Sequence, residues 1–188
     1  TMNPDGSVHI NHVLKNYDQD PVEVAPWALT VLKKDGFAII PNPLHAPHNR
    51  ENLLPVQGVI TWSYTKLDDP RINWMGKYIT ISQEPGKNQP LKLGVQKNLG
   101  YGAYAVDGNL FVKRLKYYPN MTYPDRGASL EVFTSGNMLE LESLGPLVTL
   151  KQYQETTHTE KWELYKIPKI EPKEPQIDGM FKQIDFSP

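Results

Sequence analysis

The chain has 188 residues, of which 39% are hydrophobic and 22% charged, so it has enough apolar side chains for a buried core. Twenty Lys and Arg residues nearly balance twenty-one Asp and Glu residues, and the net charge of -1 gives no general attraction to nucleic acid or anionic lipid. The lack of cysteine excludes disulfides, thiolate nucleophiles and cysteine-ligated zinc, and no apolar run reaches the roughly 20 residues of a membrane span.

Apolar side chains recur at every second residue far more often than with helical spacing, and this pattern predicts β-strands. Aromatic and β-branched residues are frequent in these segments, as is typical of strands. The predicted strands cover residues 8–14, 28–32, 37–40, 58–65, 78–82, 91–95, 102–106, 110–115, 129–134, 138–142, 147–150 and 159–165.

Two Asp-Gly pairs lie between predicted strands, where glycine accepts the positive φ that a tight hairpin needs. Asp107-Gly108 and Asp35-Gly36 are therefore both predicted to form hairpins. No window of eleven or more residues has a convincing amphipathic helical pattern. About a dozen short strands at regular spacing predict an all-β, antiparallel β-sandwich.

The domain organisation follows from two irregular stretches. Residues 41–55 hold four prolines and two histidines and are predicted to form a long loop. Residues 167–188 are predicted to be an extended, proline-rich tail, with a possible helical turn near 179–184. Residues 1–166 then form a single β-sandwich domain.

The sequence contains no nucleophile elbow, phosphate-binding glycine loop or zinc-protease motif. His45 and His48 lie in the proline-rich loop and are interpreted as solvated rather than metal-binding. We therefore predict no metal and no cofactor.

The carboxylates are more informative. Glu131, Glu140 and Glu142 alternate with apolar residues on two strands that we expect to pair as a hairpin, so all three lie on one face. That face is either a solvated outer surface or a sugar site, because carboxylates accept hydrogen bonds from hydroxyls and one can act as a general base.

Two other residue types suit a sugar site. Tryptophan rings such as Trp27 stack on sugars, although most pack in cores. Lys113 shares a face with apolar neighbours and is either a ligand contact or an edge residue that reaches water.

Two segments resemble aldose 1-epimerases (galactose mutarotases). Residues 129–137 and Leu141-Glu142-Ser143 are similar to two successive strands of the family, the second of which bears the general base. Residues 10–16 are similar to the segment whose histidine is the family's general acid. The closer likeness is to an uncharacterised bacterial branch of this superfamily, through residues 6–166. Its marks here are His12-x-x-x-Asn16, residues 25–30, Asp69-Pro70-Arg71, residues 110–113, Tyr123-Pro124-Asp125-x-Gly127 and residues 139–147.

This resemblance implies a supersandwich of two large antiparallel sheets with a sugar-binding surface, truncated at its N-terminal half. It implies His12 as general acid and Glu142 as general base. The residues expected to bind the sugar are Trp27, Lys113, Tyr123, Asp125, Glu131 and Glu140. The alternation of residues 10–14 also places His12 on the face of Ile10 and Leu14, which fits a packed core histidine equally well.

Three functions follow. The first is a carbohydrate-binding domain without established turnover. The second is an active aldose 1-epimerase, and the third is a structural or interaction domain without a sugar ligand. The expected partner is a small sugar, with no nucleic acid and no membrane. A half-supersandwich would also leave open sheet edges, so we expect either a homodimer or a longer product that supplies the missing half.

Overall fold

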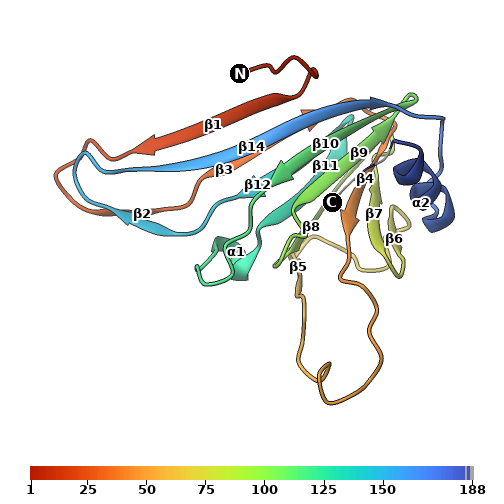
Figure 1. Ribbon diagram of the computed structural model, residues 1–188, viewed down its shortest axis with the longest axis horizontal. Coiled ribbons are helices and arrows are strands. Elements are labelled where there is room, and N and C mark those ends of the chain that lie inside the picture. Colours follow the sequence, from red (N-terminus) through yellow and green to blue (C-terminus); the bar gives the residue numbers. More distant parts are fainter. Residues whose placement is uncertain (185, 187–188) are drawn as a thin grey trace.

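The computed structural model describes residues 1–184 and 186, and it is an all-β protein with antiparallel sheets, as a β-sandwich requires. Fourteen strands and two short helices follow one another along the chain (Figure 1). In order they are β1 (Val8–Lys15), β2 (Val22–Val24), β3 (Trp27–Leu32), β4 (Phe37–Pro41), β5 (Val59–Thr61), β6 (Ile72–Trp74), β7 (Tyr78–Ser82), β8 (Lys87–Val95), β9 (Tyr101–Val106), β10 (Asn109–Leu115), α1 (Pro124–Gly127), β11 (Leu130–Gly136), β12 (Met138–Leu144), β13 (Val148–Leu150), β14 (Glu155–Lys166) and α2 (Glu174–Gln183).

The strands form two large sheets and one small one. The seven-stranded sheet has the order β1-β14-β10-β9-β4-β7-β6, and the five-stranded sheet has the order β3-β12-β11-β8-β5. A two-stranded sheet pairs β13 with β2. Figure 1 shows the long β1 and β14 strands reaching beyond the other strands of their sheet, with β2 below them.

The main core consists of the inward-facing residues of both large sheets. Leu91, Leu93 and Val95 of β8 are fully buried, and so are Leu139 and Leu141 of β12. They pack with buried residues of β4, β7, β9 and β10 from the other sheet. Alternate residues of β8, β11 and β12 therefore point the opposite way, onto the outer face of the five-stranded sheet.

The tail differs from its prediction as an extended segment, because it contains helix α2. Ile177, Met180 and Phe181 are buried and follow helical spacing, so together they form one apolar stripe. Pro175 lies in the first turn, where a proline is tolerated. The stripe packs with Ile39, Val112 and neighbouring residues on the outer face of the seven-stranded sheet.

One predicted hairpin is confirmed and the other is wrong. Asp107 and Gly108 have φ of 49° and 68° and join the paired strands β9 and β10. Asp35 and Gly36 instead join β3 to β4, which belong to different sheets. A Cβ on Gly36 would lie 2.4 Å from the Ala105 carbonyl oxygen, so glycine is needed for close approach rather than for a hairpin.

Every predicted strand overlaps an observed one, and the three-residue strands β2 and β6 were missed. The predicted strand over 58–65 shortens to Val59–Thr61. Residues 42–58 form the loop that projects below the sandwich in Figure 1. Within residues 1–184 and 186, none of the helices has the length and apolar character needed to cross a bilayer.

Candidate functional site

Glu131 and Glu142 lie directly opposite each other on the paired strands β11 and β12. This is the predicted hairpin, and their inward-facing neighbours send both carboxylates to the outer face of the five-stranded sheet. Both residues are nevertheless completely buried. The face is therefore not the solvated surface that one interpretation of the sequence expected.

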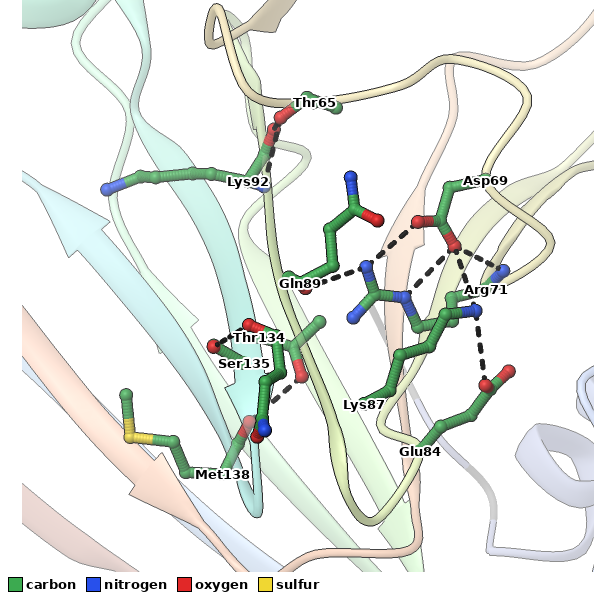
Figure 2. Close-up of polar contacts among 11 residues, drawn as sticks. Thr65, Asp69, Arg71, Glu84, Lys87, Gln89, Lys92, Thr134, Ser135 and Met138 are labelled. Atoms are coloured by element: carbon green, nitrogen blue, oxygen red, sulfur yellow. Dashed lines mark hydrogen bonds and ion pairs between the residues drawn. The ribbon is translucent and has the colours of Figure 1, made fainter.

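The sequence interpretation missed Lys92, which links the two carboxylates. Its ammonium nitrogen lies 2.7 Å from Glu131 Oε2 and 2.9 Å from Glu142 Oε2. Figure 2 shows the Lys92 side chain leaving β8 in the opposite direction from the Asp69–Arg71 ion pair, with its backbone held by the Thr65 hydroxyl. The alternation Leu91-Lys92-Leu93 was the signal that could have placed this lysine on the outer face.

Two tryptophans complete the arrangement. The Trp27 indole nitrogen donates a hydrogen bond of 2.7 Å to Glu142 Oε2. The Lys92 ammonium lies 4.9 Å from the ring centroid of Trp27 and 4.8 Å from that of Trp62, within the range of cation–π attraction. We call Trp27, Trp62, Lys92, Glu131 and Glu142 the outer-face cluster.

Gly94 makes room for this cluster at the centre of the sheet. It pairs with Glu131 on β11, and a Cβ at Gly94 would lie 3.3 Å from Glu131 Cγ and 3.4 Å from the Trp62 ring. A larger residue would push the ring away from the sheet.

Burial dominates the electrostatics of the outer-face cluster. It raises the pKa of Glu131 to about 7, and the charges of Glu142 and Asp125 act in the same direction, against the attraction of Lys92. Burial alone would lower the pKa of Lys92, but hydrogen bonds to Glu131 and Glu142 outweigh it and raise this pKa. At neutral pH Lys92 therefore stays charged, whereas the Glu131 carboxyl group is only partly ionised.

The carboxylates keep unused hydrogen-bonding capacity. Among the described residues, no donor reaches Glu131 Oε1 or Glu142 Oε1, and both atoms are buried. Buried carboxylate oxygens normally have a partner, because an unmade hydrogen bond is costly. These two oxygens therefore keep free capacity to accept hydrogen bonds.

Glu140 and Asp125, both predicted to bind substrate, lie near the cluster. Glu140 shares the face of Glu142 and is half-buried, and burial together with the Glu142 charge raises its pKa. Asp125 lies in a turn where it and Arg126 have φ of 47° and 59°, a conformation that non-glycine residues rarely adopt. The Asp125 charge is the smallest of the influences on the pKa of Glu131, and it acts to raise this pKa.

Tyr123, also predicted to bind substrate, packs within its own loop. Its ring stacks on Tyr117 with centroids 5.1 Å apart, and its hydroxyl accepts a 3.0 Å hydrogen bond from the Tyr118 backbone. It is buried and has no contact with the cluster that the hydrogen bonds or ring pairs show.

Lys113 and His12 belong to a second group, between the two sheets. The fully buried Lys113 ammonium donates to the backbone oxygens of Ala28 and Leu141 and lies 2.9 Å from Glu160 Oε1. Glu160 Oε2 accepts from the Trp162 indole at 3.0 Å and lies 3.4 Å from His12 Nε2.

Three residues of the second group, Ser143, His158 and Glu160, were not predicted. Ser143 donates to Glu160, and its oxygen lies 2.7 Å from His158 Nε2. We call Lys113, Ser143, His158, Glu160 and His12 the inner-face network. The sequence interpretation missed Glu160 and His158 because β14 alternates polar residues on both faces and shows no apolar stripe.

The predicted acid and base do not share a cleft. Glu142 and Ser143 are neighbours on β12, so their side chains point to opposite faces. Ser143 contacts the inner-face network, which includes His12, whereas Glu142 belongs to the outer-face cluster. The sheet therefore separates His12 from Glu142, and this pair cannot act together on one sugar ring.

Among residues 1–184 and 186, no three His, Asp or Glu side chains gather in a way that could hold a metal ion. In comparisons with protein-family models, with curated proteins and with solved structures, nothing matches this chain.

Proposed function

We propose that this protein is a carbohydrate-binding domain that uses the outer-face cluster, and that it binds sugar without turning it over. The observation that carries the proposal is Trp27. Its ring is 55% exposed, yet its indole is fixed by Glu142 and its face lies against the Lys92 ammonium. An exposed and oriented aromatic ring is what the apolar C–H face of a sugar stacks on.

The polar groups around the ring suit hydroxyls. Tyr64 is 39% exposed and lies close enough for the charges of Lys92, Glu131 and Glu142 to act on its pKa. Glu140 is half-buried on the same face. A sugar hydroxyl that reaches between the two rings supplies the donor that Glu131 Oε1 and Glu142 Oε1 lack.

Binding without turnover fits the separation of His12 from Glu142 across the sheet. The two large antiparallel sheets are compatible with a supersandwich of the galactose-mutarotase-like superfamily, and we propose that membership as well. Because one small face offers few contacts to offset the cost of association, we expect millimolar affinity, about -4 kcal/mol.

Calorimetric titration with galactose, glucose and their β-linked disaccharides tests the proposal. We expect the wild type to bind at least one of them and Trp27→Ala to abolish the heat of binding. Glu142→Gln should weaken binding by several fold, because the group that anchors the ring loses its charge. Trp74→Ala is the matched control, since Trp74 is 48% exposed on β6, an edge strand of the other sheet.

Absence of heat from every sugar with the wild type would overturn the proposal. Equal loss of binding in Trp27→Ala and Trp74→Ala would also overturn it, since the two rings lie on different sheets.

A further inference from the structure

A cavity of about 550 Å³ lies on the seven-stranded sheet, where β10 and β14 diverge. The two strands pair as far as Leu115 and Glu160, and beyond that point Lys116 and Tyr118 leave the sheet while β14 continues. The cavity walls include His9, Arg114, Lys116, Tyr118, His158 and Lys161. Its size is that of a small-molecule site.

The charge of this cavity is positive. Arg114 and Lys161 share one carboxylate, Glu163, at 2.6 Å and 2.7 Å. The Lys116 ammonium lies 5.0 Å from the Tyr118 ring centroid and pairs with no carboxylate among the described residues. Asp5, whose charge also acts on Lys161, has its carboxylate occupied by Ser7. Three cations against these two carboxylates leave a surplus positive charge for an anion.

His158 gives the cavity wall a hydrogen-bond acceptor. Burial lowers the pKa of this histidine, so its ring is neutral near pH 7. Ser143 has a single proton and donates it to Glu160, so the Ser143 oxygen must accept from His158 Nε2–H. This assignment leaves the lone pair on Nδ1.

Nδ1 of His158 has room for a ligand. None of the described residues hydrogen-bonds it, and a Cβ on Gly145 would lie 3.4 Å away, so glycine keeps the space beside this nitrogen free. The nitrogen can therefore accept a hydrogen bond from a molecule in the cavity.

We propose that this cavity binds a small hydroxylated organic anion. Its charged oxygens bind Lys116, at the point where β10 leaves the sheet, and one hydroxyl donates to His158 Nδ1. A sugar acid and a sugar phosphate share this chemistry. The site lies on the other sheet from the outer-face cluster and does not depend on the function proposed for that cluster.

Titration calorimetry of the full chain with gluconate, glucose 6-phosphate and glucose tests this site, and its two anionic arms distinguish carboxylate from phosphate. We expect at least one anion to bind the wild type and glucose not to occupy this cavity. Lys116→Gln should weaken the affinity for the anion at least tenfold. Lys34→Gln, which removes another exposed charge, between β3 and β4, should leave the affinity unchanged.

Nitrogen NMR of the histidine rings supplies a second readout. It uses the wild-type protein and so does not require that any variant folds. The Nδ1 resonance of His158 should shift on addition of the bound anion, because the lone pair gains a hydrogen bond. Binding by neither anion at 10 mM, an equal loss in Lys34→Gln, or an unmoved His158 resonance at saturation would each overturn the proposal.

Discussion

At the scale of single residues, the charges buried beneath Trp27 and Trp62 have the largest expected effect on stability. Burial raises the pKa of Glu131 to about 7 from an ordinary 4.5, so the folded protein holds a proton that the unfolded chain loses. The corresponding stabilisation is fully present below about pH 4.5 and is lost as the pH rises through about 7.

We therefore predict that Glu131→Gln flattens the pH dependence of stability. Between pH 4.5 and 8 the free energy of unfolding of the wild type should fall relative to that of the variant by on the order of 1–3 kcal/mol. Urea denaturation across this range measures it, with the exposed Glu23→Gln as control. Parallel curves for the wild type and Glu131→Gln would show that Glu131 titrates normally.

Arg71 offers a second test at this scale. Its guanidinium is almost completely buried and donates to both oxygens of Asp69, at 3.0 Å and 2.8 Å, and to the Gln89 carbonyl at 3.0 Å (Figure 2). The hydrogen bonds from Arg71 lower the pKa of Asp69 to about 2.

Arg71→Met should cost about 3–5 kcal/mol, because it leaves the buried Asp69 carboxylate with only the longer ion pair to Lys87, at 3.7 Å. Arg71→Lys keeps the charge but not the paired hydrogen bonds, so it should cost less. Urea midpoints at pH 7 give both numbers. A loss below 1 kcal/mol in Arg71→Met would mean that water replaces the guanidinium.

The residues of the two clusters show what the sequence could predict. Period-two alternation correctly placed Glu131, Glu140 and Glu142 on one face, because every second side chain of a β-strand points to the same side of the sheet. Alternation says nothing about what covers that face, so burial by Trp62 and the pairing with Lys92 were not predicted. His12 and Glu142 were grouped by resemblance, and the sheet separates them because sequence order does not reveal which sheet a strand joins.

At the scale of elements, the strands were predictable and their partners were not. Asp107-Gly108 lies between strands that pair with each other, so the two turn residues were sufficient to predict the hairpin. Asp35-Gly36 has the same turn residues but connects strands of two different sheets. Long-range packing, which the local sequence does not reveal, determines which sheet each strand joins. Helix α2 was predicted only as a possible helical turn near residues 179–184, because its apolar stripe is only three residues and the sheet that it covers provides most of its stability.

The loop over residues 42–58 makes a prediction at this scale. Residues 44–56 are exposed throughout and belong to no helix or strand. Limited trypsin digestion should cleave first after Arg50, because an exposed loop opens locally at little cost. Mass spectrometry of the first fragments identifies the site. First cleavage within β8, β10 or β14 would mean that the loop is packed.

At the scale of the whole molecule, β3 is one of the two edge strands of the five-stranded sheet. It has the outward apolar side chains Leu29 and Val31, which are 44% and 62% exposed. Unprotected edges with apolar residues pair with other chains. The expectation of a homodimer stays a prediction, and light scattering should give twice the mass of the chain for the wild type and a lower mass for Val31→Lys. A wild-type monomer at 0.1 mM would contradict it.

The central claim is that the Trp27 face binds carbohydrate, and the four tryptophan indole N–H signals in a nitrogen–proton correlation spectrum test it most directly. On titration with the sugar that gives calorimetric heat, or with galactose to 50 mM, the account predicts that the Trp27 and Trp62 signals move together along one saturating curve. Trp74, on the other sheet, and Trp162, whose indole donates to Glu160 of the inner-face network, should stay in place. Four unmoved signals, or shifts of Trp74 or Trp162 as large as those of Trp27, would contradict it.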